Sequence, residues 1–385
     1  MLVVLLAFLR LGCMSFGGPA AHLAYFRHEF VERRGWLTDG QFAQCISITQ
    51  LLPGPSSSQT GMLIGLIRAG WPGAAGAWIG FTLPSAALMT AFGLYSPHMR
   101  TSQGWLHGLL VVAVAIVAQA VVTMRRALIS NLAQLLLAMA TCAAMLLLRS
   151  AATAPLAIVV CAAAGLGLAS PRIASQEALP VRVSRTAAMI AALLFAGIFA
   201  ALAVCARVWH DPLVTLASRL YAVGSLVFGG GHVVLPLLQS TIVNSGMASA
   251  QRMIAGYAAV QAMPGPLFTL SSYVGSMVYN GSLGVAGAVV ATLAIFLPSF
   301  FLLAAVIPFY VQLARNRRFV SALAGANAGV VGLLAAAFVS PVWTNAIHTW
   351  ADALFAAAAF ALLALVRVPP WIVVICGATA GALLL

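Results

Sequence analysis

Apolar segments of about 20 residues recur from one end of this chain to the other, and each is long enough to cross the roughly 30 Å hydrocarbon layer of a bilayer as a helix. Of the 385 residues, 63% are hydrophobic and only 6% are charged. Lipid offers the backbone no hydrogen bonds, so a spanning chain must be helical or a closed barrel, and the alternating pattern of barrel strands does not occur here. The sequence therefore predicts an all-α polytopic membrane protein.

The charged residues exclude some classes of partner. All 19 basic residues are arginines, against six acids, which gives a net charge of +13. The arginines are spread over short loops and form no long basic run, so nucleic acid is not an expected partner. The positive-inside bias of membrane proteins explains them, and a positive potential suited to anions stays open as a second interpretation. The six cysteines occur singly, without metal-ligand spacing, so neither a metal nor a cofactor is expected.

Three short motifs that interrupt helices occur twice, in the same order. FGG at 16–18 returns at 228–230, PGP at 53–55 returns at 264–266, and LPS at 83–85 returns at 297–299. The separations are 212 residues from Phe16 to Phe228, 211 from Pro53 to Pro264 and 214 from Pro84 to Pro298. One order at nearly one offset indicates an internal duplication.

The apolar pattern predicts two homologous repeats of six spans each, joined by one connecting span. The expected spans are 1–26, 40–68, 73–95, 105–124, 128–148 and 154–170, then 186–208, then 213–242, 250–280, 284–311, 319–340, 343–366 and 369–385. The polar segment 169–185 marks the boundary, giving a first repeat at 1–170, a linker and connecting helix at 171–210, and a second repeat at 211–385. A single connecting span predicts inverted repeats. If 40–68 is instead a re-entrant hairpin, the count changes and the repeats become parallel.

This count also divides the arginines between the two sides of the membrane. One side receives Arg125, Arg126, Arg172, Arg182, Arg185, Arg252, Arg315, Arg317, Arg318 and Arg367, and the other receives Arg27, Arg33, Arg34, Arg100, Arg149 and Arg207. The positive-inside rule then places the first side, with the N-terminus, in the cytoplasm and the C-terminus in the periplasm. The basic cluster at 27–36 counts against this assignment.

Together the motifs resemble the chromate ion transporter (CHR) family in its long, two-domain form. The resemblance rests on FLRLGCMSFGGPAAHLAYFRHEFVERRGWL, QLLPGPSSSQ and GFTLPSA in the first half, with FGGG and QAMPGP in the second. It implies a multi-pass protein of the bacterial inner membrane that exports chromate and confers chromate resistance, with sulfate as the related oxyanion. Because the chain begins almost at the first motif, a late or truncated start at Met1 is expected.

Other functions stay open beside chromate export. Transport of sulfate or another oxyanion is the main alternative. A membrane-embedded enzyme is a weaker one, since it would need clustered acids, and only Glu29, Glu32 and Asp39 come near one another in the sequence. We therefore expect a transporter and no catalytic residues. The lipid bilayer is the surrounding partner, and a homo-oligomer is an open alternative.

The breaks themselves predict the binding site. A broken helix leaves backbone groups without partners, at several kcal/mol each in lipid, unless protein or a wet cavity covers them. Half-helices whose N-termini face a shared point would bind an anion without lysine. The predicted substrate-binding residues are Arg10, Phe16, Gly17, Gly18, Pro53, Gly54, Pro55, Ser56, Ser57, Ser58, Gly229, Gly230, Gly231, Pro264, Gly265, Pro266 and Thr269. The alternative for each break is a kink that only shapes packing, and the LPS prolines are assigned to it.

Two further groups of charged residues have competing interpretations. Arg10 lies inside the first span, where it either faces the anion path or extends towards the interface. The four residues Glu29, Glu32, Arg33 and Arg34 form either a solvated interfacial stretch or a gate of ion pairs at the mouth of the path. His22 and His28 are expected to pack, not to bind metal.

Overall fold

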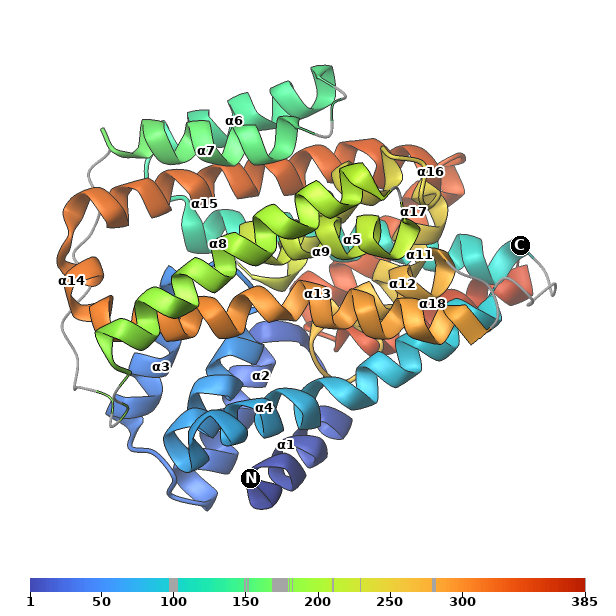
Figure 1. Cartoon of the computed structure of the whole chain (residues 1–385). Coiled ribbons are helices and arrows are strands. Elements are labelled where there is room, and N and C mark those ends of the chain that lie inside the picture. The colour runs from blue at the N-terminus through green and yellow to red at the C-terminus, as the bar shows by residue number, and fades with distance from the viewer. Residues whose placement is uncertain are drawn as a thin grey trace.

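The computed structural model describes residues 1–96, 103–148, 150, 152–167, 179, 181, 183–209, 211–228, 230–278 and 282–384. Across these ranges all regular structure is helical (Figure 1), which confirms the predicted all-α fold. Among the described residues, five helices are long and apolar enough to cross a membrane, at Ser56–Tyr95, Gly104–Leu128, Arg185–Val208, Leu283–Arg315 and Arg317–Ala346.

The elements follow the duplication. The first repeat contains α1 (Leu2–Met14), α2 (Gly18–Arg27), η1 (His28–Arg33), α3 (Asp39–Leu51), α4 (Ser56–Tyr95), α5 (Gln103–Leu128), α6 (Leu132–Leu147) and α7 (Thr153–Gly165). Helix α8 (Arg185–Val208) connects the repeats. The second repeat contains α9 (Pro212–Leu226), η3 (Gly231–Val233), α10 (Val234–Leu238), η4 (Gln239–Val243), α11 (Ala250–Gln261), η5 (Leu267–Thr269), α12 (Leu270–Val278), α13 (Ser282–Val306), η6 (Ile307–Phe309), α14 (Tyr310–Arg315), α15 (Arg317–Ala337), η7 (Phe338–Trp343), α16 (Thr344–Ala346), α17 (Trp350–Ala361), η8 (Leu362–Val366) and α18 (Pro370–Leu384).

The first apolar segment folds back on itself at the FGG motif. The ring of Phe8 in α1 lies 5.4 Å from that of Phe26 in α2 and 4.7 Å from that of Phe30 in η1. Helix α2 and η1 therefore run back alongside α1 to the side where the chain began. The predicted single crossing at 1–26 is wrong, because apolar length alone cannot distinguish a crossing from a hairpin with a break at its tip.

The second apolar segment is a hairpin as well. The hydroxyls of Thr49 in α3 and Thr60 in α4 lie 3.0 Å apart on either side of the PGP turn. At the open end, the ring of Trp36, just before α3, lies 5.4 Å from the guanidinium of Arg68. Residues 40–68 therefore re-enter and do not cross. Helix α4 reverses at Gly70, whose φ is 63°, and only the part after this residue crosses.

The second repeat folds in the same way. Arg219 in α9 donates a hydrogen bond to the carbonyl oxygen of Thr241 in η4 at 2.8 Å, so these segments form one hairpin. The hydroxyl of Tyr273 in α12 donates to the carbonyl oxygen of Arg252 in α11 at 3.0 Å, which closes the second hairpin. The expected crossings at 213–242 and 250–280 are therefore also hairpins.

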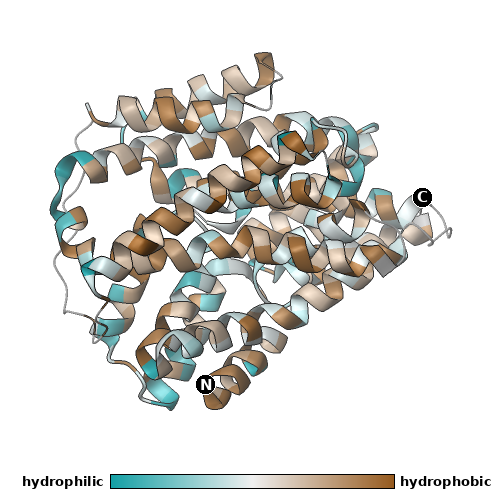
Figure 2. Cartoon of the chain, in the orientation of Figure 1, coloured by the Kyte–Doolittle hydropathy of each residue, from teal (hydrophilic) through white to brown (hydrophobic). Residues whose placement is uncertain are grey.

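The repeats are nevertheless inverted, as predicted. Helix α13 is the counterpart of α4 after Gly70, and the two run antiparallel. Trp78 packs against Phe300 with ring centroids 5.8 Å apart, whereas Tyr95, at the far end of α4, lines a groove with Val285 near the start of α13. Two hairpins replace two crossings in each repeat, so the parity is unchanged. The N- and C-termini lie towards opposite ends of the molecule (Figure 1), and polar residues gather at these ends (Figure 2).

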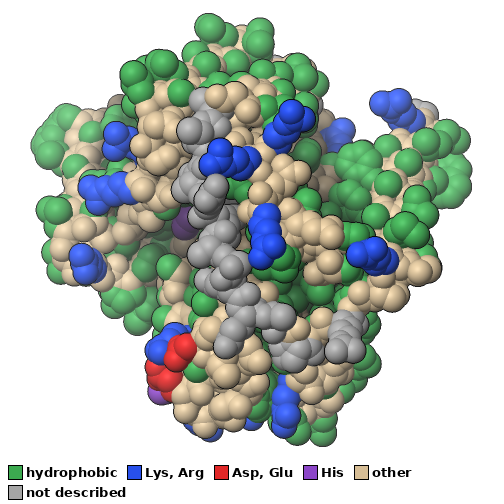
Figure 3. Space-filling model, turned by 90° about the vertical axis from the view of Figure 1, so that its left-hand side faces the viewer, with side chains coloured by type: hydrophobic (Ala, Val, Ile, Leu, Met, Phe, Trp, Pro, Cys, Tyr) green, Lys and Arg blue, Asp and Glu red, His purple; other side chains and the backbone are tan. Residues whose placement is uncertain are grey.

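The hairpins change which arginines share a side. Because the first two hairpins return to the end where they began, Arg27, Arg33 and Arg34 lie at the same end as Arg68 and as Arg315 of α14 (Figure 1). Figure 3 shows arginine side chains spread over this face. The predicted placement of Arg27, Arg33 and Arg34 on the opposite side is wrong, because it counted each hairpin as a crossing.

The mouth of a repeat is the end at which its two hairpins are open. Arg252, near the start of α11, lies at the mouth of the second repeat, at the end of the molecule opposite to Arg27, Arg33 and Arg34. The contradiction between the cluster at 27–36 and the positive-inside rule disappears. Four of the arginines assigned from the sequence lie outside the described residues, namely Arg100, Arg149, Arg172 and Arg182.

Candidate functional site

The FGG breaks and PGP turns of the two repeats meet through crosswise hydrogen bonds. The amide nitrogen of Gly54 donates to the carbonyl oxygen of Val227 at 2.6 Å, and the amide nitrogen of Gly265 donates to the carbonyl oxygen of Ser15 at 2.9 Å. Ser15 and Val227 are equivalent, since each immediately precedes an FGG motif. Each PGP turn therefore satisfies a backbone carbonyl at the broken first helix of the other repeat.

Only glycine fits at the centre of each PGP turn. Gly54 has φ 120° and Gly265 has φ 101°, in the left-handed region that residues with a side chain rarely adopt. A Cβ on Gly54 would lie 2.8 Å from the hydroxyl of Ser299, and a Cβ on Gly265 would lie 2.8 Å from the hydroxyl of Ser85. Each turn thus packs against the LPS serine of the opposite repeat, a relationship that assigning LPS to a simple kink had missed.

Gln59 strengthens one of these contacts. Its side-chain nitrogen donates to the carbonyl oxygen of Pro53 at 2.7 Å and to the hydroxyl of Ser299 at 3.2 Å. Below, the tips are the FGG breaks and PGP turns at which the hairpins reverse. The carbonyl oxygens of Ser15, Pro53 and Val227, which lie at the tips, all accept hydrogen bonds.

Several buried donors near the same motifs are not occupied. They lie within about two helical turns of a motif, and within the described ranges they have no hydrogen-bond partner: the hydroxyls of Ser15, Ser58, Thr82 and Ser271, and the side-chain nitrogen of Gln261. One acceptor, Gln59 Oε1, is also unpartnered. A buried polar group without a partner costs about 1–3 kcal/mol. A surplus of donors in one place is the arrangement that an oxyanion can satisfy.

Helix N-termini converge on the same region. Helices α2, α4, η3 and η5 begin directly after a break, at Gly18, Ser56, Gly231 and Leu267. No side chain caps the start of α4, where Pro55 is the N-cap residue, so the amides of its first turn have no side-chain acceptor. Free first-turn amides and the helix dipole both favour negative charge.

His22 lies beside the start of α4. It is buried, its Nδ1 lies 3.3 Å from the hydroxyl of Ser57, and its ring meets Phe81 edge-on at 5.1 Å. The sequence analysis treated this histidine only as a packing residue, because nothing in the local pattern links it to the PGP turn 30 residues later. Among the described residues no cluster of three His, Cys, Asp or Glu side chains could hold a metal.

The predicted hydroxyl donors differ in their availability. Ser57 and Ser58 are buried, Ser57 contacts His22, and the Ser58 hydroxyl is unpartnered. Thr269 is also buried, but its hydroxyl donates to the carbonyl oxygen of Pro266 at 2.8 Å. Ser271, which follows the same PGP turn, has a buried hydroxyl without a partner among the described residues and is the more available donor of the second repeat.

The second glycine of each FGG motif borders open space. Gly18 has φ 76° and Gly230 has φ 112°, and an added Cβ at either position would meet no atom within 4 Å. Phe16 closes one side, with its ring 5.7 Å from that of Trp371. Gly229 lies outside the described residues.

Arg10 lies on the exposed face of α1, together with the exposed apolar residues Leu2, Val3 and Leu6. Within the ranges that the structure describes, no hydrogen bond or ion pair involves its guanidinium. Its role in an anion path stays a prediction.

The four residues predicted to form a gate make ion pairs at the arginine-rich end. Glu29 is buried and accepts hydrogen bonds from Arg33 at 2.7 Å and from Arg34 at 2.6 Å. Burial raises the pKa of Glu29, but the hydrogen bonds from Arg34 and Arg33 outweigh it and hold the pKa below its ordinary value. Glu32 pairs with Arg27 and, at 2.8 Å, with His28.

Trp36 connects this cluster to the second hairpin. Its ring lies 5.2 Å from the guanidinium of Arg34 and 5.4 Å from that of Arg68. Stacking of both guanidinium groups on one indole joins the end of the α1–α2 hairpin to the end of the α3–α4 hairpin. Below, the ion-pair cluster means Arg27, His28, Glu29, Glu32, Arg33, Arg34 and Asp39, in which Arg27 pairs with both Glu32 and Asp39.

Comparison with known proteins agrees with the duplicated architecture. The profile of the family described as chromate transporter matches residues 2–168 and again residues 214–382. The chain belongs to the chromate transporter family. This transporter is 28% identical over 356 residues to a chromate transport protein of Pseudomonas aeruginosa, covering 86% of this chain and 78% of that protein.

Other relatives show similar coverage. A chromate transport protein of Cupriavidus metallidurans is 24% identical over 337 residues, covering 86% of the transporter and 80% of the relative. An uncharacterized transporter of Methanocaldococcus jannaschii is 25% identical over 342 residues, covering 86% and 82%. No solved structure matches the chain.

Proposed function

We propose that this protein exports chromate from the cytoplasm of a bacterium across the inner membrane, and thereby confers chromate resistance. The observation that carries the proposal is the pair of crosswise hydrogen bonds, Gly54 to Val227 and Gly265 to Ser15. They bring the broken helices of two inverted repeats to one point. Inverted-repeat transporters bind substrate at such an interface, near the middle of the membrane.

The chemistry of the site supports an oxyanion as the substrate. Chromate at neutral pH is largely a tetrahedral dianion that accepts hydrogen bonds on every oxygen. Free donors surround the tips, including the hydroxyls of Ser58 and Ser271. Gly18 and Gly230 leave the space beside the backbone open, so a tetrahedral anion has room to approach the main chain. Membership of the family, whose named relatives are chromate transport proteins, favours chromate among the oxyanions.

The expected direction follows from the orientation of the chain. With the arginine-rich end in the cytoplasm, the N-terminus is inside and the C-terminus is outside. An inside-negative potential favours the exit of a dianion by about 2.3 kcal/mol per charge per 100 mV, or about 4.6 kcal/mol in all. The ion-pair cluster then lies at the cytoplasmic mouth, where its arginines attract anions and its pairing closes the path.

Transport assays test this proposal. Cells that carry the gene should lose preloaded radiolabelled chromate faster than cells without it, and reporter fusions should place the two termini on opposite sides. Excess sulfate should compete with chromate, whereas chloride and nitrate should not, because they lack the tetrahedral shape and double charge. Equal efflux with and without the gene would refute the proposal. Faster transport of sulfate or of another oxyanion than of chromate would favour the alternative substrate.

A further inference from the structure

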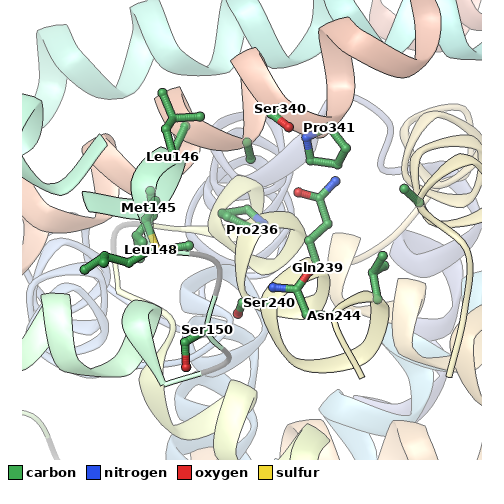
Figure 4. A pocket seen from close by; sticks show the side chains of 15 residues that line it. Met145, Leu146, Leu148, Ser150, Pro236, Gln239, Ser240, Asn244, Ser340 and Pro341 are labelled. Carbon is green, nitrogen blue, oxygen red and sulfur yellow. The ribbon is translucent and has the colours of Figure 1, made fainter. Parts of the chain in front are cut away.

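The mouth of the second repeat contains a cavity of about 430 Å³. It lies between η4, the end of α6, the end of α15 and η7 (Figure 4). Its lining has five polar side chains, from Ser150, Gln239, Ser240, Asn244 and Ser340, and the other lining residues are apolar. Lining residues from both repeats meet here, because α6 belongs to the first repeat.

The duplication shows what this cavity replaces. Gly35 and Gly246 are equivalent, with an offset of 211 residues, and η1 and η4 start at equivalent positions, His28 and Gln239. At this offset the positions of the ion-pair cluster correspond to cavity-lining residues, with His28, Glu29, Glu32, Arg33 and Asp39 replaced by Gln239, Ser240, Val243, Asn244 and Ala250. One mouth is therefore filled by ion pairs, whereas the cavity at the other mouth has no charged side chain in its lining.

One polar group in the cavity lacks a partner. Gln239 is 6% exposed, and its side-chain nitrogen has no hydrogen-bond partner among the described residues. The amide of Asn244 lies nearby in the same cavity (Figure 4). The Ser240 hydroxyl is less available, since it donates to the carbonyl oxygen of Leu237 at 2.9 Å. Gln239 and Asn244 thus provide uncharged donors to a space large enough for an oxyanion and several waters.

We propose that this cavity is the outer vestibule of the anion path, an inference that rests on the proposed function. The cavity is then also a second, weak binding site for the transported oxyanion. Neutral amide donors bind a dianion less tightly than arginines do, because they add no Coulombic attraction between opposite charges. An anion that leaves the central site is held briefly by Gln239 and Asn244 and then released. The arginines at the first mouth collect anions, and the uncharged lining of this cavity lets them leave.

Thiol labelling tests the vestibule directly. Asn244→Cys is introduced into a variant whose six native cysteines are replaced by serine or alanine. This variant is expressed and labelled in intact cells. A membrane-impermeant methanethiosulfonate reagent added outside should label it. Saturating sulfate, which unlike chromate does not oxidise thiols, should slow labelling at least threefold relative to chloride of equal ionic strength. The matched control is Arg33→Cys, the equivalent position of the first repeat, which should be labelled only from the cytoplasmic side.

The outcomes separate this inference from the proposed function. Labelling of Asn244→Cys from the cytoplasmic side only, or at an unchanged rate in sulfate, overturns the vestibule even if the wild-type protein transports chromate. Slower labelling with vesicles of anionic lipid but not with sulfate would overturn it in favour of a lipid headgroup site. If Asn244→Cys fails to fold, Ser240→Cys serves in its place.

Transport through a Gln239 variant adds a second measurement. In proteoliposomes, Gln239→Leu should raise the half-saturating oxyanion concentration on the outer face several-fold and leave that on the inner face unchanged. An equal change on both faces would assign Gln239 a purely structural role and contradict the proposal.

Discussion

The amide nitrogen of Gly54 donates to the carbonyl oxygen of Val227 at 2.6 Å, across the boundary between the two repeats. Its counterpart joins Gly265 to Ser15 with the same geometry and the repeats exchanged. Each bond satisfies a backbone carbonyl that a broken helix leaves open within the membrane. The repeats are thus held together where their helices are interrupted, so the interface and the candidate site depend on the same residues.

Replacing Gly54 by alanine should remove transport and destabilise the protein. The left-handed φ of 120° strains any side chain, at about 1–3 kcal/mol, and the new Cβ would lie 2.4 Å from the side-chain nitrogen of Gln59. Transport and the thermal unfolding of the purified protein provide the measurement. The control is Gly197→Ala in α8, where an added Cβ meets nothing within 4 Å. Normal transport by Gly54→Ala would contradict a constrained turn.

Valine at Gly18 or Gly230 should abolish transport per folded molecule. Both glycines have positive φ and border open space, so the substitution combines backbone strain with a side chain in the site. Gly246→Val separates these effects, because Gly246 has φ 77° and open space too but lies at the mouth of the second repeat. Transport normalised to folded protein should survive in Gly246→Val. Equal losses in all three variants would attribute the effect to strain alone.

Removing the hydroxyls at the start of α4 should weaken oxyanion binding. Alanine at Ser56, Ser57 and Ser58 together should cost about 1–3 kcal/mol in apparent affinity, since hydrogen bonds to a charge are lost. Ser58→Ala should account for the largest share because its buried hydroxyl is free. The measurement is half-saturation of chromate or sulfate transport. Thr90→Ala removes a hydroxyl bonded only to the carbonyl of Ala86 in its own helix, and it should change nothing.

Arg10→Gln should reduce chromate transport strongly at unchanged membrane abundance. An arginine at membrane depth costs at least ~2.5 kcal/mol, and an exposed one needs water or an anion near it. Arg10→Lys should retain part of the activity, because the charge remains while the planar guanidinium is lost. Normal efflux by well-expressed Arg10→Gln would assign this side chain to the membrane interface.

The stabilising effect of Glu29 should depend on pH. Its pKa in the folded protein lies below the ordinary value of 4.5, so its contribution to stability is fully present above that value and is lost as pH falls through the folded pKa. Glu29→Gln should lower the free energy of unfolding by about 1–3 kcal/mol near neutral pH. We expect the lower part of this range, because Arg33 is 47% exposed and solvent screens its attraction to Glu29.

The difference between wild type and Glu29→Gln should shrink below pH 4.5, as measured by thermal unfolding in detergent. Glu32→Gln is the control, since this carboxylate is 46% exposed and its pairs are weaker. A constant difference between wild type and Glu29→Gln across this range would show that the carboxylate charge does not stabilise the fold.

Much of the architecture was predictable because the repeated motifs consist largely of glycine and proline, which interrupt helices. Gly54 and Gly265 can be aligned from the sequence, and inversion follows from an odd connecting helix. The hairpins were not predictable, since a hairpin with a central break has the apolar length of a crossing. Their signature is a contact between segment ends, such as Trp36 with Arg68, and hydropathy carries no information about it.

The candidate site was predictable only in part. Motif spacing selected the FGG and PGP residues that the crosswise hydrogen bonds join, but each LPS serine contacts the opposite repeat, as Ser299 does at Gly54. His22 was missed for a related reason. Its relation to the start of α4 depends on how the hairpins pack in three dimensions, and no local pattern in the sequence marks it.

Helix α8 places the two repeats in opposite orientations, although little of its surface is buried against the rest of the protein. Only 11% of its apolar stretch is buried, and the Tyr221 hydroxyl of α9 donates a hydrogen bond to the carbonyl oxygen of Phe195 in this helix. Tandem duplication without such a helix would leave both repeats in one orientation, and the Gly54 and Gly265 bonds could not form. A protein with a single repeat would have to insert into the membrane in both orientations and form a dimer of oppositely oriented copies. In evolutionary terms, α8 is the addition that let one gene encode both orientations.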